Sequence, residues 1–370
     1  MGSAEIKFFE NVIETTENCR YCLMCRHTCP VGLGTHNETL TPHGWGLIIA
    51  SVKRGLLTWN AQTVDALYSC ADCGNCRAHC VFDQPLPHAI AAARAEVAAQ
   101  NLAPAVVYEL NELFKKWGNP YQPQAPEPLG GSGNVALFVG DEARYLWPSA
   151  LAAALKLLKA IGVEPILVGE GRSNGFLASS LGLFETAKML AQAVLDDVKA
   201  SGASRLLVLS PGDFYSFGQL YTERLGIAWP ESVAVQEVTV LLADKLDAGA
   251  LKFKPISDET PYAYLDPTHT VRVPERVEAP RKLLAALYGK PGLEVFWRKD
   301  RAHPAGNTAL QFTQPELSHQ LTMGRLYDTL EVGARRVICD DPGTLSAIKA
   351  GAEQVRLEAL GLYELLAGQL

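Results

Sequence analysis

After residue 80 the sequence is almost without cysteine. Its 9 cysteines lie between Cys19 and Cys80, with the single exception of Cys339. The sequence also lacks a basic block, because 33 Lys and Arg residues and 40 Asp and Glu residues are spread along the chain and give a net charge of -7. A nucleic-acid-binding surface needs clustered positive charge, so the composition gives no indication of that function.

No apolar run is long enough to span a membrane. The best candidate, "ALAAALKLLKAIGVEPILVG", is interrupted by Lys156, Lys159 and Glu164. The first residues, "MGSAEIKFFE", do not show the basic-then-apolar pattern of a secretory signal. We therefore expect a cytoplasmic protein, either free or held peripherally at a membrane through a complex. Thiols stay reduced there, and clustered cysteines favour metal binding over disulfides.

A chain of 370 residues is longer than one hydrophobic core usually organises, so we expect several domains. Apolar residues recur at helical spacing around the cysteines, and a Pro- and Gly-rich stretch follows them. The predicted organisation is a helical domain, a linker and two α/β units, at residues 1–103, 104–133, 134–258 and 259–370 respectively.

From residue 134 onward, short β runs alternate with amphipathic helical stretches. The order strand, helix, strand, helix, strand occurs twice, at about 134–215 and about 262–343, which indicates an internal duplication. Strands separated by helices imply parallel pairing with helices on the sheet faces. The expected strands are residues 135–140, 165–169, 205–210, 261–266, 293–297 and 335–340.

The cysteines form two runs with the same spacing, C-x2-C-x2-C-x3-C. The runs are "CRYCLMCRHTC" and "CADCGNCRAHC", with cysteines at Cys19, Cys22, Cys25, Cys29 and at Cys70, Cys73, Cys76, Cys80. Three closely spaced thiolates can hold three corners of a [4Fe-4S] cluster, while the fourth cysteine of such a run ligates the other cluster. The spacing therefore predicts two clusters with crossed ligands. Cluster 1 is assigned to Cys19, Cys22, Cys25 and Cys80, and cluster 2 to Cys70, Cys73, Cys76 and Cys29.

The pattern disfavours two other interpretations of the cysteines, zinc sites and disulfides. Zinc sites usually combine two separated C-x-x-C pairs, whereas these runs are triplets followed by a fourth cysteine. Disulfides are disfavoured in a reduced compartment. One feature departs from the two-cluster ferredoxin pattern, because Pro30 follows Cys29 but Val81 follows Cys80.

The motifs resemble the iron–sulfur subunits of the heterodisulfide reductase and glycolate oxidase group. The corresponding segments are "CRYCLMC…CP", "TPHGWGLIIASVKRG" with His43 in place of an arginine, and "CADCGNC". The resemblance implies an α-helical ferredoxin-like domain followed by two duplicated α/β units. It also implies electron exchange with an FAD-dependent dehydrogenase subunit and with an acceptor such as a quinone, a ferredoxin or an electron-transferring flavoprotein.

In that group each α/β unit carries cysteines in "CCG" and "CPxC"-like elements, which this chain has mostly lost. Their counterparts here are Ser173, Asn174, Ser210, Asp213 and Thr268, and only Cys339 remains. A single thiol cannot assemble a cluster, so we expect no third cluster and no disulfide chemistry in the C-terminal region.

The favoured function is therefore an iron–sulfur electron-transfer subunit that is not catalytic on its own. Two alternatives stay open: a self-contained heterodisulfide-reductase-like catalyst, and a non-redox interaction module stapled by clusters.

Several weaker candidates have a structural explanation beside the functional one. "GEGRSNG", residues 169–175, is read as a degenerate cluster loop rather than a nucleotide site. His27 and His79 could tune a cluster or simply face solvent. His269 and Asp266 could line a cleft, although a structural turn is preferred. We expect Trp45 and Trp59 to be buried near the clusters, and Cys339 to be an inert thiol.

Overall fold

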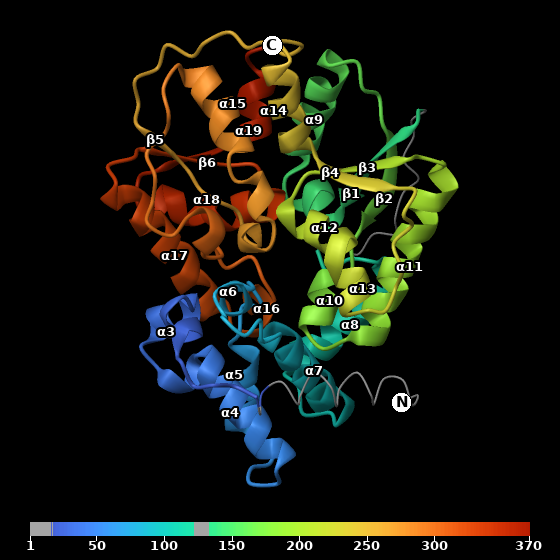
Figure 1. Cartoon of the computed structure of the whole chain (residues 1–370), viewed down its shortest axis with the longest axis vertical. Helices are drawn as coiled ribbons and strands as arrows, with labels where there is room; N and C mark the ends of the chain where they lie inside the picture. The colour runs from blue at the N-terminus through green and yellow to red at the C-terminus, as the bar shows by residue number, and fades with distance from the viewer. Residues whose placement is uncertain (1–15, 17, 122–132) are drawn as a thin grey trace.

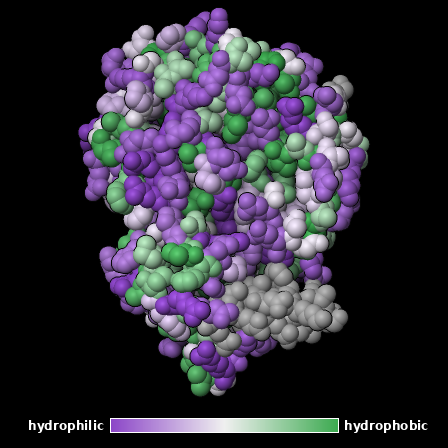
Figure 2. Space-filling model, viewed as in Figure 1, coloured by the Kyte–Doolittle hydropathy of each residue, from purple (hydrophilic) through white to green (hydrophobic). Residues whose placement is uncertain are grey.

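The computed structural model describes residue 16 and residues 18–121 and 133–370. These residues form a helical N-terminal region and two α/β units, which run from blue through green and yellow to red in Figure 1. In that view the helical region lies below the two units, which stand side by side. Hydrophilic and hydrophobic residues are interspersed over both units on the face shown in Figure 2. Among the described helices, none has both the length and the apolar character that crossing a membrane requires.

Short helices with clear start signals build the N-terminal region. Thr41 caps one of them by accepting a hydrogen bond from the Gly44 amide at 3.2 Å, with Pro42 at its first position. Asn60 and Thr63 form a reciprocal capping box at the start of the next. The elements are α2 (Met24–His27), α3 (Pro30–Thr35), η1 (Glu38–Leu40), α4 (Pro42–Lys53), α5 (Ala61–Tyr68), α6 (Asn75–Ala78), α7 (Leu86–Ala99) and α8 (Ala105–Trp117).

Helix α8 occupies the first part of the segment predicted as a linker. Its apolar residues Val107, Leu110 and Phe114 follow helical spacing and are buried against α11 and α16. Gly118 ends the helix in the left-handed conformation that glycine adopts without strain. Residues 122–132, which hold most of the Pro- and Gly-rich sequence, lie outside the described residues.

The first α/β unit contains a four-stranded parallel sheet in the order β2-β1-β3-β4. Its strands are β1 (Val135–Gly140), β2 (Ile166–Arg172), β3 (Arg205–Val208) and β4 (Ala234–Glu237). Its helices are η2 (Glu142–Leu146), α9 (Pro148–Ala160), α10 (Phe176–Ser180), α11 (Phe184–Ser201), α12 (Pro211–Tyr215), η3 (Ser216–Leu220), α13 (Tyr221–Glu223) and α14 (Val238–Asp247). The predicted parallel pairing is confirmed, and β4 is a further strand that the sequence analysis did not predict.

The second α/β unit contains a three-stranded parallel sheet in the order β5-β6-β7. Its strands are β5 (Tyr262–Tyr264), β6 (Arg336–Cys339) and β7 (Glu358–Gly361). Its helices are η4 (Thr270–Arg272), η5 (Pro274–Arg276), α15 (Ala279–Tyr288), η6 (Lys299–Arg301), α16 (Leu310–Thr313), α17 (Pro315–Glu331), α18 (Pro342–Gln354) and α19 (Leu362–Ala367). The strand predicted at 293–297 is wrong in extent, because only Leu293 forms a parallel bridge, to Ala263.

The two units share one topology. With the Leu293 bridge in the place of β2, the order Leu293-β5-β6-β7 repeats β2-β1-β3-β4. The helix after the first strand of each unit packs on the last helix of the other, since α9 contacts α19 and α15 contacts α14. This reciprocal contact is what two copies of one unit make around an approximate twofold axis.

Each sheet is covered on both faces. In β1, Ala136 and Phe138 join the core shared with the helical region, whereas Leu137 and Val139 join the core between the units. That second core also contains Tyr262, Tyr264 and Ile338 of the second sheet. The period-two alternation of a strand explains why one short segment serves two cores.

A buried polar network crosses the core between the units. The Arg276 guanidinium of the second unit donates to Glu237 of the first at 2.6 Å and also binds Asp340. The Thr239 hydroxyl of the first unit donates to Asp340 at 2.6 Å. Because buried charges are costly unless paired, these contacts fix one relative placement of the two units.

Candidate functional site

The two cysteine loops have the same backbone conformation. Tyr21 and Leu23 in the first loop adopt left-handed φ angles of 54° and 61°. Asp72 and Gly74, at the same positions in the second loop, adopt φ angles of 46° and 94°. In each loop the residue two after the first cysteine directs its amide to that sulfur, at 3.5 Å for Tyr21 and 3.3 Å for Asp72. The left-handed turns therefore aim the loop amides inward, toward the space between the thiols.

The thiols gather in two crossed sets. Cys25 lies near Cys19, Cys22 and Cys80, and these four line one cavity together with Cys76. Cys29 lies near Cys70 and Cys73, and with Cys76 these thiols line a second cavity. Cys76 borders both cavities, so the two sets adjoin. The fourth cysteine of each run thus stands with the first three of the other run; the ligation itself stays a prediction.

The two sets differ in exposure. In the first, Cys22 is exposed and the other thiols are half-buried. In the second, Cys29, Cys70 and Cys76 are 4%, 5% and 9% exposed. The first set therefore lies close to the surface, and the second lies where the helical region meets the α/β units.

The donor chemistry of both sets fits an iron–sulfur cluster. Burial raises the pKa of the Cys25 thiol to about 11 and of Cys70 to about 12, and raises those of Cys29 and Cys76 well above the usual value. Such thiols become thiolates only when a cation displaces their protons, as iron does. The backbone amide of Gly32 donates to the Cys29 sulfur at 3.4 Å. The side-chain amide of Asn75 donates to the Cys73 sulfur at 3.7 Å. N–H donors of this kind stabilise the negative charge of a thiolate-bound cluster.

All nine cysteines are free thiols in the structure. Among the described residues, no three or more His, Cys, Asp or Glu side chains are arranged to hold a single metal ion.

Asp72 is a site residue that the sequence analysis missed. It is 2% exposed and lies between Cys70 and Cys73. Burial opposes its ionisation, but the guanidinium groups of Arg224 and Arg272 hold the pKa of its carboxyl well below the usual range. These two arginines lie 152 and 200 residues away along the chain, so no local motif could have indicated them.

The second α/β unit contacts the same loop at a further point. The Asn75 side chain, next to Cys76, donates to the Ala302 carbonyl at 2.8 Å. One residue on, the His303 ring stacks on Trp297 with centroids 3.9 Å apart. Burial lowers the pKa of His303 to about 3, so this imidazole is neutral near pH 7.

The histidines and tryptophans near the cysteines differ in exposure and in their contacts. His27 is exposed, and the His79 ring bonds the Asn75 carbonyl at 3.1 Å. Trp45 is buried, and its indole N–H donates to Ser69 at 3.2 Å. Trp59 is half-buried and donates to Glu96 at 3.1 Å.

The five residues that the motif resemblance aligns with cysteines converge on one cleft between the α/β units. Ser173, Asn174, Ser210, Asp213 and Thr268 all line it. The cleft spans about 750 Å³, counted out to its open mouth. It lies beyond the carboxyl ends of strands from both sheets, where parallel α/β folds usually place ligands. Cys339 does not line it; this thiol is 0% exposed, and burial raises its pKa well above the usual value.

The cleft is acidic. Burial, followed by repulsion from neighbouring carboxylates, raises the pKa of Asp141 to about 7 and that of Asp341 to about 6. Burial also raises the pKa of Asp213 to about 7 and that of Glu142 well above its usual value. No Lys or Arg is among the described lining residues. An anionic ligand would therefore meet no compensating positive charge there.

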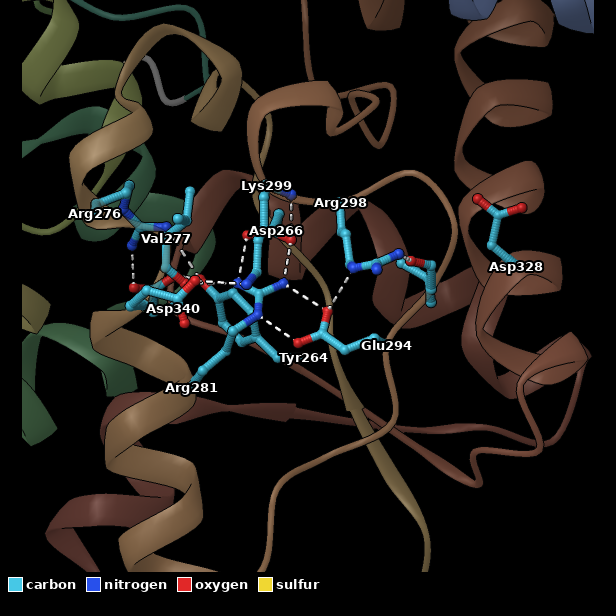
Figure 3. Close-up of polar contacts among 12 residues, drawn as sticks. Tyr264, Asp266, Arg276, Val277, Arg281, Glu294, Arg298, Lys299, Asp328 and Asp340 are labelled. Carbon is cyan, nitrogen blue, oxygen red and sulfur yellow. Dashed lines mark hydrogen bonds and ion pairs between the residues drawn. The ribbon is translucent and has the colours of Figure 1, made fainter.

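His269 and Asp266 have different surroundings, although both were candidates for a cleft. His269 lines the cleft, packs on Phe176 with centroids 4.5 Å apart, and has a pKa that burial lowers to about 3. Asp266 lies outside the lining and binds Arg281 at 2.7 and 2.9 Å (Figure 3). Asp266 also accepts from the Lys299 amide at 3.0 Å, so it ties its turn to α15 and η6.

The glycines of residues 169–175 allow neighbouring side chains to pack closely against the backbone. Gly169 adopts a φ of 90°, and a Cβ there would lie 2.5 Å from the Phe138 ring. Gly171 adopts a φ of 81° and would meet Tyr145 at 2.9 Å. This segment is the end of β2 and its following turn, and these glycines let β1 and η2 pack closely against it.

Comparison with known proteins agrees with the chemistry of the cysteines. The family model described as a 4Fe-4S dicluster domain matches residues 15–84. No curated protein matches the chain. A hypothetical protein from Helicobacter pylori has a similar fold, with a TM-score of 0.61 and 10% identity, over 100% of this chain and 74% of that one. A putative Asp/Glu racemase from Yersinia pestis aligns with a TM-score of 0.28 and 10% identity, over 64% of this chain and 96% of that one.

Proposed function

We propose that this chain, which carries a 4Fe-4S dicluster domain, is the electron-transfer subunit of an oxidoreductase complex. The observation that carries the proposal is the pair of adjoining thiol sets, each built from both cysteine runs. Each cluster, when bound, supplies one-electron transfer. The protein's part is to hold two such groups side by side, one near the surface and one inside.

The proposed ligands follow the crossed arrangement. Cluster 1 is assigned to Cys19, Cys22, Cys25 and Cys80, and cluster 2 to Cys70, Cys73, Cys76 and Cys29. The similar backbone of the two loops supports the same kind of cluster in both sites, because in each loop one backbone amide donates to the sulfur of the first cysteine. The crossing also ties α2 to α6, which are in contact.

The exposed side of cluster 1 is the proposed entry for electrons from a partner. Cys22 is exposed there, and its neighbours Tyr21, Met24 and Phe82 are 53%, 47% and 52% exposed. An FAD-dependent dehydrogenase subunit is the donor we propose, because the motif resemblance implies one. The acceptor would be a quinone, a ferredoxin or an electron-transferring flavoprotein.

The α/β units support a self-contained disulfide reductase less well. Hydroxyl, amide and carboxyl groups stand at the cysteine positions of the cleft, and the Cys339 thiol is buried elsewhere. We propose instead that these units form the scaffold around the loop that would hold cluster 2. Arg224 and Arg272 bind Asp72 of that loop, and the Ala302 carbonyl accepts from Asn75.

The test is metal analysis and spectroscopy of the chain purified without oxygen. The proposal expects about eight irons per chain and two reducible [4Fe-4S] signals by electron paramagnetic resonance. Reduction by a flavoprotein partner with its substrate, but not by the substrate alone, would support a subunit over a self-contained catalyst. Stoichiometric zinc in place of iron would refute the proposal, and clusters that no donor reduces would favour the non-redox module.

A further inference from the structure

Each α/β unit contributes one arginine that binds the carboxylate of Asp72, in the second cysteine run. Arg224 of the first unit donates to the two oxygens of Asp72 at 2.8 and 3.2 Å. Arg272 of the second unit donates to Asp72 Oδ1 at 2.8 Å and to the Asp72 carbonyl at 2.6 Å. The side chains of these arginines are 0% and 5% exposed, so both charges are buried beside Cys70 and Cys73.

A third buried guanidinium holds the start of the same loop. Arg94 of α7 is 0% exposed and donates to the carbonyl of Cys70 at 2.7 Å and to that of Leu67 at 2.9 Å. Two guanidinium groups therefore bind the Asp72 carboxylate and a third binds the backbone of the same loop, so three buried positive charges stand against one buried carboxylate beside the second thiol set.

Among the residues that the structure describes, no comparable set of buried arginines surrounds the first thiol set. Its run contains two arginines, and one of them, Arg26, pairs with Glu38; these side chains are 41% and 65% exposed. Arg20 lines the first cavity but is exposed. Exposed charges are screened by water and salt, whereas buried ones are screened much less.

We propose that the buried arginines give cluster 2 the higher reduction potential of the pair, so that electrons pass inward from cluster 1 and rest on cluster 2. This inference rests on the proposed function and adds the direction of flow to it. It also gives the α/β units a role in electron transfer, because Arg224 and Arg272 come from them.

The physical reason is the charge added on reduction. A reduced cluster carries one more negative charge than an oxidised one, and burial alone disfavours that charge. A nearby guanidinium in a poorly screened interior attracts it strongly. Arg272 is the most direct contributor, because its guanidinium lies against Gly74, between Cys73 and Cys76, where a Cβ would stand 2.9 Å from its Nε.

The experiment is a redox titration of the purified iron-loaded chain, followed by electron paramagnetic resonance. Cys22→Ser and Cys73→Ser variants assign each signal to its cluster. The midpoint potentials of the wild type are then compared with those of Arg272→Gln, Arg272→Lys and the control Arg26→Gln. Titrations at low and high salt separate buried from exposed charge.

We expect cluster 2 to have the higher midpoint in the wild type, with a difference that persists at high salt. In Arg272→Gln the reduced-to-oxidised ratio of cluster 2 at a fixed potential should fall about tenfold, a shift of about 59 mV for one electron. Arg272→Lys, which keeps the charge, should recover most of that shift. Arg26→Gln should leave both midpoints nearly unchanged.

A wild-type cluster 2 with a midpoint equal to or below that of cluster 1 would overturn the inference even if no Arg272 variant folds. An equal shift of cluster 2 in Arg272→Gln and Arg272→Lys would overturn the role of charge and indicate a role in positioning alone. Failure of the proposed function would look different, since the chain would then lack two reducible iron–sulfur signals.

Discussion

Cys80, the last cysteine of the second run, lies beside Cys25, the third cysteine of the first run. Cys29 stands in the same relation to the second run, beside Cys70 and Cys73. The crossing makes each cavity depend on both runs, so substitutions at the two fourth cysteines should have opposite effects.

Cys29→Ser should damage cluster 2 and leave cluster 1 largely intact, whereas Cys80→Ser should do the reverse. A cluster without one thiolate loses an iron or takes a weaker oxygen ligand, so each variant should alter one signal. Both variants should also be less stable, because metal-binding free energy is partly folding free energy. Electron paramagnetic resonance and iron analysis measure the outcome.

Cys22→Ser is the matched control for this pair, because Cys22 belongs to the first set in every assignment. If Cys29→Ser alters the same signal as Cys22→Ser, each run ligates its own cluster and the crossed assignment is wrong.

Asp72 is expected to be critical for stability. Asp72→Ala would leave Arg224 and Arg272 buried without their anion, a loss that typically costs about 3–5 kcal/mol of unfolding free energy. Glu38→Ala is the control, because it breaks an exposed ion pair with Arg26 that is worth at most about 1 kcal/mol. Denaturant unfolding of the iron-loaded proteins compares the two. Equal small losses would mean that Asp72 is not essential to the contact between the helical region and the α/β units.

The sequence predicted the parts of the fold that have strong local patterns. Strands β1, β3, β5 and β6 are apolar and lie within their predicted ranges, and their parallel pairing followed from the helices between them. Strand β4, "AVQE", and strand β7, "EALG", have mixed sequences at the sheet edge and gave no such signal. The run at 293–297 is apolar, yet pairing reaches only Leu293, and Phe296 is 59% exposed.

The sequence likewise predicted one part of the candidate site and not the other. The cysteine spacing, with the ligand rule of two-cluster ferredoxins, predicts the crossed grouping of the eight thiols, and their ligation stays a prediction. Asp72 and its arginines could not be found from the sequence, since their pairing depends on how the α/β units pack on the helical region. Helix α8 was not predicted, because the Pro- and Gly-rich composition of the residues after it is typical of a linker.

Cys339 should be inert and unrelated to iron. Cys339→Ala should keep the full iron content and lose about 1 kcal/mol of stability, as is usual for a single buried substitution. In the folded chain its buried, protonated thiol should resist N-ethylmaleimide, and it should react after denaturation. Mass spectrometry locates the label. A loss of about four irons in Cys339→Ala would instead reveal a third cluster in the C-terminal region.

The acidic cleft should make the protein less stable as pH rises from about 4 to about 7. Burial raises the pKa of Asp141 and Asp213 to about 7, whereas an unfolded Asp has a pKa of about 3.9. Between those values the folded chain binds more protons than the unfolded chain. Each group therefore lowers stability by up to about 1.4 kcal/mol per pH unit, and the loss is complete above pH 7.

Asp213→Asn tests this effect while preserving the local contacts. Its amide oxygen can still accept from Asn174, which donates to Asp213 at 2.7 Å, and its amide nitrogen can donate to the Ser210 oxygen. The variant should match the wild type near pH 3.5, below the unfolded pKa, and should become more stable than it as pH rises to 7, because it stays neutral. Asp196→Asn, on the exposed face of α11, should show no such gain. Unfolding midpoints measured between pH 3.5 and pH 8 test the prediction. An Asp213→Asn variant less stable than the wild type at pH 8 would show that the ionised carboxylate is favourably solvated in the cleft.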